Sequence, residues 1–232
     1  MDDSRGRGRR LDPDPRVRKS IVAAASKAVR EEGVRGLSVA QVLSRAGLGT
    51  RAFYRHFDSK DQLVSAVFLD MARAETRRLR KRMATATDPV DAVVAWIDGR
   101  LDLAFSDQVK SDLRQMSLEA QSQMFAAPEV IGAAYAEILI PLVEQLERGR
   151  QLGCFTGVDP AADAMSIQGA LWASVERQWA TGDCDRGDVR RSMLRFCLRG
   201  LGVDPVALAE ALAGNTTHLA ATRPDRPIAG ET

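Results

Sequence analysis

The sequence has little of what disulfide frameworks, metal centres and histidine-based active sites are built from. Its three cysteines are odd in number and form no C-x-x-C pair, so we interpret them as reduced thiols. The two histidines, His56 and His218, have no second histidine three or four residues away, which disfavours zinc sites and Ser-His or Cys-His catalysis. We therefore expect no metal and no cofactor.

Long hydrophobic runs are also missing. No stretch of about 18 apolar residues is present to cross a bilayer, and the polar start MDDSRGRGRR has no apolar segment that could serve as a secretory signal. We expect a cytoplasmic protein that does not bind a membrane. With 232 residues, 45% of them hydrophobic and 28% charged, the chain has the composition and length of a globular protein with a sizeable core.

No strand pattern and no internal repeat is apparent. Apolar residues recur at spacings of three and four nearly throughout, which predicts an all-α fold of about nine or ten helices. Residues 1–15 and 214–232 have little to bury, so we expect a disordered basic arm and a flexible tail. Glycine- and proline-containing segments predict helix breaks at 33–36, 47–49, 58–59, 85–89, 127–128, 153–160, 181–187 and 202–205.

The charge is distributed unevenly. The net charge is only +2, but residues 1–60 hold 14 Lys and Arg against 7 Asp and Glu, whereas residues 61–232 hold 19 against 24. The first segment is thus +7 and the rest −5. This asymmetry favours a basic N-terminal module that binds a polyanion, with a basic solvated surface as the plainer alternative.

Residues 38–57 have the layout of a helix-turn-helix. A first helix from about Pro15 to Glu32, ended by Gly33, precedes them. Ser38 stands at an N-cap position with Gln41 three residues on, which predicts a capping box. Gly47 allows a sharp left-handed turn. A helix from Thr50 to Phe57 follows, and Asp58 or Ser59 is expected to cap the next helix.

The second helix of this pair has two different faces. Phe53 and Phe57 are four residues apart and are expected to pack inward. Thr50, Arg51, Arg55 and His56 then point outward and form a polar, cationic face that suits the phosphates and base edges of a DNA groove. A solvated face on a purely structural helix is the alternative.

The segment GLSVAQVLSRAGLGTRAFYRHFDSKDQLVSAVF resembles the DNA-binding signature of the tetracycline-repressor (TetR) family. Its diagnostic parts are the cap of the first helix, the alanine-glycine turn, the pair Phe53-Tyr54, Phe57, and the Ser59-Lys60 helix start. The resemblance covers residues 16 to about 68. It implies a three-helix DNA-binding domain at 16–60 and a larger helical ligand-binding and dimerisation domain at 61–213.

The resemblance also implies roles for matching positions. Ser38, Tyr54, His56 and Lys60 would bind phosphates; Thr50 and Arg51 would contact bases, with Gln41 and Arg55 as weaker candidates. Two positions depart from the family pattern: Gly49, where members often have a serine cap, and Ala40, where some have a longer side chain. The first departure would leave capping to Thr50, at the expense of base contact.

The N-terminal arm is rich in arginine and interrupted by Asp12 and Asp14. Family members with such extensions can place them along the minor groove, where narrow A-tracts attract arginine. A nonspecific basic tail is the equally weighted alternative. The arginines concerned are Arg5, Arg7, Arg9, Arg10, Arg16 and Arg18.

One such module contacts only a half-site, so we expect a homodimer on a palindromic operator. The resemblance places the dimer interface on the last two long helices, at about 160–181 and 186–201. Their small and apolar stripes agree with this, although packing inside one chain would produce the same pattern. The stripes are Ala164, Ile167, Ala170, Leu171, Ala173 and Ser174, and Met193, Leu194, Cys197, Leu198 and Leu201.

Large apolar side chains recur in the predicted ligand-binding and dimerisation domain, where the resemblance implies a ligand cavity. They favour a hydrophobic or aromatic effector. The domain has no histidine before His218 to help hold a metal chelate, which disfavours a tetracycline-magnesium complex. Ordinary core packing is the alternative for each of them. The tentative ligand-binding residues are Trp96, Phe105, Met116, Met124, Phe125, Tyr135, Met165, Trp172 and Trp179.

These features predict a transcriptional regulator, expected to be a repressor, that a small effector releases from double-stranded DNA. A regulator without an effector, constitutive or controlled by a protein, is the alternative. We do not expect an enzyme, because no glycine-rich phosphate loop, metal-ligand cluster or catalytic triad supports one.

Overall fold

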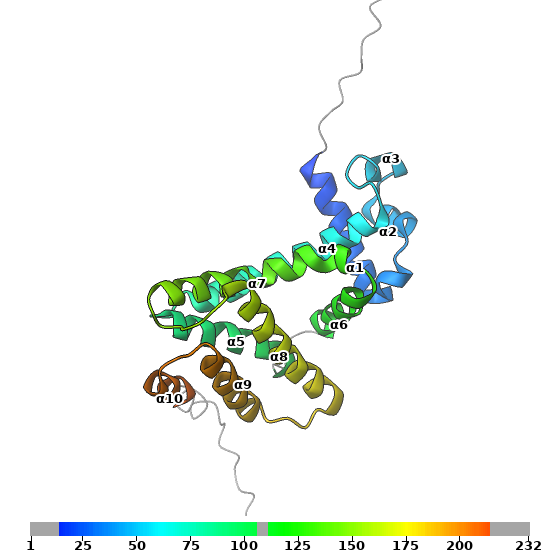
Figure 1. The fold of residues 1–232 in the computed structure, drawn as a ribbon. Helices are drawn as coiled ribbons and strands as arrows, with labels where there is room; N and C mark the ends of the chain where they lie inside the picture. The colour runs from blue at the N-terminus through cyan, green and yellow to red at the C-terminus, as the bar shows by residue number, and fades with distance from the viewer. Residues whose placement is uncertain (1–13, 106–110, 214–232) are drawn as a thin grey trace, which may run out of the picture. The chain divides into compact units, whose positions relative to one another are not determined.

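The structure is a computed structural model that describes residues 14–105 and 111–213. The described residues form ten helices and no strand, which confirms the all-α prediction (Figure 1). The segment predicted to be a flexible tail and most of the predicted basic arm, including Arg5, Arg7, Arg9 and Arg10, lie outside the described residues.

The chain divides into two compact units. The N-terminal unit comprises Met1–Ala74 and Lys110–Glu137, and the C-terminal unit comprises Glu75–Val109 and Ile138–Thr232. Two helices, α4 (Lys60–Met83) and α7 (Pro128–Gln151), contribute residues to both units. The domain boundary expected after residue 60 remains a prediction.

The N-terminal unit contains α1 (Pro15–Gly36), α2 (Val39–Ala46), α3 (Thr50–Phe53) and α6 (Ser111–Ala126), with the first parts of α4 and α7. Asp14 caps α1 by accepting a hydrogen bond from the Arg16 N–H, and Pro15 occupies the first turn, where its missing N–H does no harm. Helix α1 packs against α2 and α6. One face of α1 is buried in this unit, along Ile21, Ala25, Ala28 and Val29.

Helix α1 is broken where the sequence predicts its end. Gly33 has φ 71° and ψ 174°, a conformation that favours glycine. The Val34 N–H, displaced from the helical pattern by this break, donates to Oε1 of Glu119 on α6 at 3.2 Å. A side chain 85 residues away therefore satisfies the backbone at the break, which fixes α6 against the end of α1.

The C-terminal unit is built around α5 (Pro89–Phe105), α8 (Pro160–Thr181), α9 (Arg186–Gly200) and α10 (Pro205–Ala213). Helix α5 packs against α8 and α9, and α10 packs against α9 and α5, as Figure 1 shows. Asp159 caps α8 by accepting from the Ala161 and Ala162 N–H groups, each at 3.1 Å. Together with the end of α4 and the second part of α7, these helices enclose one apolar core.

The predicted breaks coincide with ends of helices, except that the first lies within α1, at the non-helical Gly33. Residues 106–110, between α5 and α6, lie outside the described residues.

The stripes expected to form the dimer interface are mostly buried within the C-terminal unit. Their larger members on α8 and α9 belong to its own core, which is the alternative that the sequence left open: Ala164, Ile167, Leu171, Met193, Leu194, Cys197, Leu198 and Leu201. Other apolar side chains face outward on the same helices. Met165 and Phe196 are each 66% exposed.

Candidate nucleic-acid interface

The turn between α2 and α3 has the expected left-handed glycine. Gly47 adopts φ 66° and ψ 31°, and the N–H groups after the last turn of α2 fold back onto it. The Gly47 N–H donates to the Ser44 carbonyl at 3.2 Å, and the Leu48 N–H donates to the Leu43 carbonyl at 2.9 Å. These bonds satisfy the carbonyls at the helix end and reverse the chain sharply.

Helix α3 is shorter than the eight residues expected from the sequence. Its regular part is Thr50–Phe53, and a hydrogen-bonded turn completes it as far as Phe57. The Phe53 carbonyl accepts from both the His56 N–H at 2.8 Å and the Phe57 N–H at 2.9 Å. This shared acceptor tightens the last turn, so the chain stays coiled while regular α-helical geometry ends at Phe53.

Two phenylalanines anchor α3, as the sequence predicts. Phe53 and Phe57 are each 2% exposed, and their ring centroids lie 5.7 Å apart. The Arg18 guanidinium of α1 lies 5.2 Å from the centroid of the Phe57 ring, within the range of a cation–π contact. Arg18, expected only as part of the basic arm, therefore also packs against the anchor of α3.

The opposite side of α3 faces outward. Thr50, Arg51, Tyr54 and Arg55 are exposed, and His56 is half-buried. Tyr54 is 67% exposed although its ring makes an edge contact with Phe53, at 5.3 Å between centroids. One side of the exposed Tyr54 ring therefore packs against the buried anchor of α3.

Capping at α3 differs from the sequence-based expectation. Gly49 is the N-cap residue and provides no side chain, while Thr50 is already the first helical residue. Thr50 therefore does not act as the N-cap, and its exposed side chain makes no capping hydrogen bond.

The predicted capping box at α2 is wrong. Ser38 does stand at the N-cap, but its side chain makes no capping hydrogen bond. Gln41, expected to complete the box, is exposed. The first N–H groups of α2 thus receive no side-chain acceptor from Ser38, which leaves its hydroxyl for other partners.

Helix α4 begins with the side-chain cap that α2 and α3 lack. Ser59 Oγ accepts from the Gln62 N–H at 3.1 Å, and Gln62 Oε1 accepts in return from the Asp58 N–H at 2.6 Å. This reciprocal pair fixes the start of α4, with half-buried Lys60 as its first residue. A lysine at the positive end of a helix suits an anion such as a phosphate.

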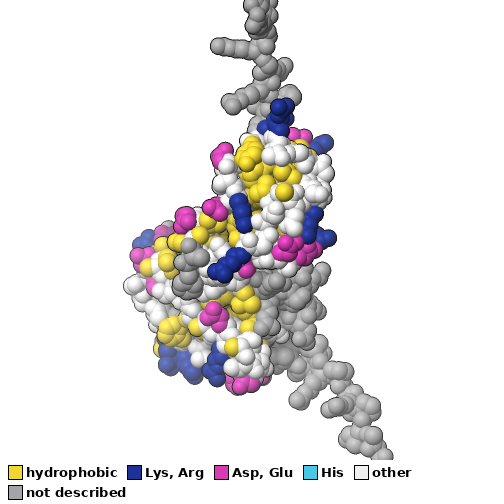
Figure 2. Space-filling model, turned by 90° about the vertical axis from the view of Figure 1, so that its right-hand side faces the viewer, with side chains coloured by type: hydrophobic (Ala, Val, Ile, Leu, Met, Phe, Trp, Pro, Cys, Tyr) yellow, Lys and Arg dark blue, Asp and Glu magenta, His cyan; other side chains and the backbone are white. Residues whose placement is uncertain are grey.

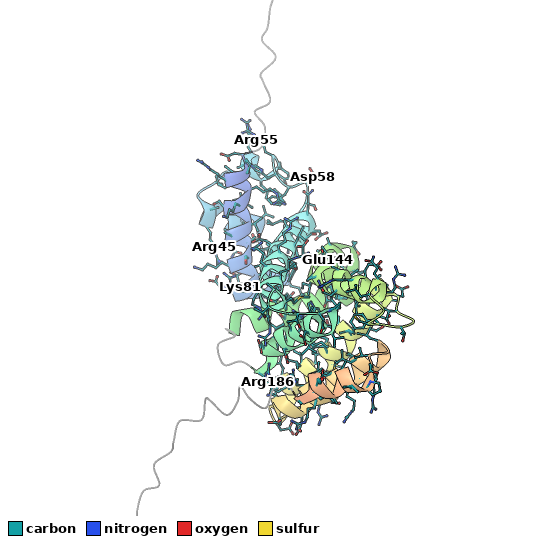
Figure 3. All side chains as sticks on the ribbon, turned by 90° about the vertical axis from the view of Figure 1, so that its left-hand side faces the viewer. Arg45, Arg55, Asp58, Lys81, Glu144 and Arg186 are labelled. Carbon is teal, nitrogen blue, oxygen red and sulfur yellow. The ribbon has the colours of Figure 1, made fainter. Side chains whose placement is uncertain are left out.

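The cations of this unit fall into two groups. Arg45 of α2 pairs with Glu31 at 2.6 Å and with Glu32 at 3.0 Å, so its charge holds α2 against α1. Within the part of the chain that the structure describes, Arg51 and Arg55 form no ion pair. Figure 3 shows Arg45 along the side of α1 and Arg55 at the α3 end of the unit. In Figure 2, both Lys or Arg and Asp or Glu side chains lie around an area of hydrophobic side chains.

The nine tentative ligand-binding residues are divided between the two units. Met116, Met124 and Tyr135 belong to the N-terminal unit, where the Tyr135 hydroxyl donates to Gln121 at 2.8 Å. Met165 is exposed on α8, and the side chain of Phe125 lies outside the described residues. The remaining four, Trp96, Phe105, Trp172 and Trp179, pack in or against the core of the C-terminal unit.

Sequence reasoning missed a group of buried charged residues in the C-terminal unit. Arg190 of α9 donates to both carboxylate oxygens of Asp98 on α5, and Arg100 of α5 lies 3.2 Å from Glu75 on α4. The signal was present: Arg190 occupies the same face of α9 as Met193, Leu194 and Cys197. A charged residue in an apolar stripe indicates a buried partner.

None of the described helices is both long enough and apolar enough to span a membrane.

Residues 21–67, which include α2, the turn and α3, match the family described as bacterial regulatory proteins of the tetR family. Among curated proteins, the HTH-type transcriptional activator FasR of Mycolicibacterium smegmatis is 27% identical over 124 residues. That match covers 53% of this chain and only about half, 54%, of the relative.

Solved structures share the fold over most of the chain. FadR from Bacillus subtilis, solved with stearoyl-CoA, is 19% identical with a TM-score of 0.61, over 78% of this chain and 98% of that one. RolR, solved with resorcinol, is 21% identical with a TM-score of 0.58, over 85% and 93%. The helix-turn-helix of this chain is therefore a DNA-binding domain of the tetR family of bacterial regulatory proteins, within a helical chain that has the fold of such regulators.

Proposed function

We propose that this chain represses transcription by binding a palindromic operator in double-stranded DNA as a homodimer, and that a small hydrophobic or aromatic effector releases it. The observation that carries the proposal is the outward face of α3, held by the buried pair Phe53 and Phe57. A rigid helix with exposed arginines and hydroxyls is what direct readout in a major groove requires.

The outward residues divide by their chemistry. Arg51 and Thr50, at the start of α3, are assigned to base edges, because arginine can form two parallel hydrogen bonds to guanine. Tyr54 and Lys60 are assigned to phosphates, together with Ser38 and His56. Gln41 and Arg55 are exposed and serve as secondary candidates for base contact. The phosphate contacts set the register in which the base contacts read the sequence.

The homodimer rests on the outward faces of α8 and α9 rather than on the buried stripes. Met165 and Phe196 are 66% exposed, and a side chain at Gly169 would meet open space. Exposed large apolar residues beside a small residue allow the helices of two subunits to approach closely.

The interface has its own test. Met165→Glu with Phe196→Glu is expected to give a folded monomer in sedimentation equilibrium. Val206→Glu, at an apolar residue of α10 with the same exposure, serves as the matched control and stays dimeric.

The effector is supported by the fold alone. Regulators with this architecture have been solved with stearoyl-CoA and with resorcinol, so the fold accommodates both long acyl and small aromatic ligands. Helix α4 contributes residues to both units, which makes it the candidate for coupling ligand to DNA. A coupling of about 1 to 3 kcal/mol changes operator affinity roughly 5- to 150-fold. The alternative, a regulator without an effector, would lack this change.

Repression, as opposed to activation, needs its own test, because the curated relative is named an activator. A random duplex pool selected with the full chain should yield an inverted repeat that binds two chains. Placed over a promoter of a reporter gene, this repeat should reduce expression. A direct repeat, or one chain per site, would contradict the homodimer, and increased expression would contradict repression.

A further inference from the structure

Among the described residues of the C-terminal unit, four buried side-chain nitrogen or oxygen atoms have no hydrogen-bond partner. One is Nε of Arg100, whose guanidinium pairs with Glu75 through another nitrogen. The other three belong to uncharged side chains: Nε1 of Trp96, Nε1 of Trp172 and Oε1 of Gln168, on residues that are 0%, 8% and 7% exposed. More than nine in ten buried polar groups in native proteins are hydrogen-bonded, because desolvating one without compensation is unfavourable. Three such atoms in one unit therefore require a physical explanation.

The three side chains come from two helices that pack against each other. Trp96 is on α5, while Gln168 and Trp172 lie one turn apart on the same face of α8. Trp96 and Trp172 belong to the same apolar core. The Trp172 ring also meets the Trp179 ring edge to face, with 5.5 Å between centroids. The polar atoms are thus set among aromatic and aliphatic side chains.

The hydrogen-bonding capacity of the three atoms defines a complementary group. Each indole N–H can only donate, and an amide oxygen can only accept. A hydroxyl oxygen accepts two hydrogen bonds and donates one, which matches two indoles and one amide oxygen. A neutral carbonyl would satisfy the donors and leave Gln168 Oε1 without a partner.

The charges of this unit disfavour an anionic ligand. A carboxylate already offsets the charge of each buried arginine that the structure describes: Glu75 lies 3.2 Å from Arg100, although Arg100 Nε makes no hydrogen bond, and Asp98 lies 2.7 Å from Arg190. A buried carboxylate or phosphate needs a cation or several charge-assisted donors to offset its desolvation. Two neutral indoles suit a neutral oxygen instead.

We propose that Trp96, Trp172 and Gln168 are the polar anchors of the effector site, and that the effector is a neutral hydroxylated compound with an aromatic body, a phenol. That the phenol acts as an effector rests on the proposed function. Binding of the phenol to the protein does not require DNA, so phenol binding and control of DNA binding can fail separately.

The experiment titrates the full chain with 4-methylphenol, 4-methylanisole, toluene and 4-methylbenzoate, and measures affinity by calorimetry and by the shift in melting temperature. The wild type is expected to bind 4-methylphenol tightest. Loss of the hydroxyl proton in the anisole, or of the oxygen in toluene, should weaken binding about 3- to 10-fold for each hydrogen bond lost. The benzoate should bind weakest.

Three variants isolate the anchors. Trp96→Phe and Trp172→Phe keep a ring and remove the N–H, and each should weaken 4-methylphenol about 3- to 10-fold while leaving toluene nearly unchanged. Gln168→Met should remove the preference for the phenol over the anisole. Because it removes an unsatisfied buried oxygen, it should also raise the melting temperature of the ligand-free protein. Glu176→Gln, at an exposed residue of α8, is the control and should keep the wild-type order.

Two results would overturn the proposal. One is that none of the four probes binds, in which case bound water is the partner of these atoms. The other is that both tryptophan variants bind the phenol as the wild type does. If the phenol binds as expected but leaves operator affinity unchanged, the anchors stand and the effector-controlled function fails.

Discussion

Arg190 of α9 and Asp98 of α5 form a two-pronged ion pair inside the C-terminal unit, with nitrogen–oxygen distances of 2.7 and 3.1 Å. Arg190 is 4% exposed and Asp98 7%. One turn further along α5, Asp102 accepts from Arg186 of α9 at 2.8 Å and from Arg82 of α4 at 2.7 Å. Carboxylates on α5 therefore hold the arginines of two neighbouring helices.

Removing one member of the buried pair is expected to destabilise the protein strongly. Arg190→Met leaves the buried Asp98 carboxylate with only the more distant Arg186, at 4.0 Å, and loss of the close partner of a buried ion amounts to about 3–5 kcal/mol. The double variant Arg190→Met with Asp98→Leu removes both charges and should recover most of that loss. Urea denaturation of the three proteins measures it. If the double variant is as unstable as the single one, the loss comes from packing rather than from the unpaired charge.

Glu75 predicts a dependence of stability on acid pH. Burial raises its pKa, but hydrogen bonding to Arg78 and the charges of Arg100 and Arg78 outweigh burial, so the pKa lies below the ordinary value of 4.5. The stabilisation from the ionised carboxylate is thus complete above about pH 4.5 and is lost as pH falls through the lower, folded-state pKa. The free energy of unfolding of Glu75→Gln should fall less than that of the wild type between pH 6 and pH 3. Equal slopes for the two proteins would contradict the assignment.

The three thiols should differ in reactivity. Cys197 is 3% exposed, and burial raises its pKa to about 12, so only about one molecule in ten thousand carries the thiolate at pH 8. Cys154 and Cys184 are half-buried. Ellman's reagent should therefore titrate two thiols in the native protein and three after denaturation. Cys197→Ser should leave the native count unchanged, and a count reduced to one would contradict the burial of Cys197.

Glu119 should stabilise the N-terminal unit through a single backbone contact. Its Oε1 accepts the Val34 N–H at 3.2 Å beside the break at Gly33. Glu119→Ala leaves that partly buried N–H without an acceptor, and the expected loss of stability is about 1–3 kcal/mol. Glu119→Gln keeps an acceptor oxygen and serves as the control. Hydrogen exchange at Val34 measures the effect locally, and equal protection in both variants would contradict the role.

The fold of the N-terminal unit was largely predictable because its turns and buried anchors depend on residues close together in the sequence. Gly33, Gly47, Phe53 and Phe57 act within one or two turns of the chain, and the structure places each as the sequence predicts. The errors concern side-chain geometry. Ser38 occupies the N-cap without using its hydroxyl, and α3 tightens after Phe53, because the final turn depends on which carbonyl the His56 and Phe57 N–H groups share.

The C-terminal unit was less predictable because its contacts are distant in sequence. A stripe containing Ile167 and Leu171 looks the same whether it packs on its own chain or on a second one, and the structure places it in the core. The Arg190–Asp98 contact joins residues 92 positions apart. Spacing along one helix contains no information about such partners.

The central claim is that the outward face of α3 binds DNA, and the most direct measurement is a fluorescence anisotropy titration of the selected duplex. The double variant Arg51→Ala with Tyr54→Ala should lose at least about 10-fold in affinity at constant salt, since a base contact alone is worth about 1–3 kcal/mol. Arg150→Ala, an exposed arginine of α7, is the control for the charge removed and should bind as the wild type does. A folded double variant that binds the duplex as tightly as Arg150→Ala would contradict the account.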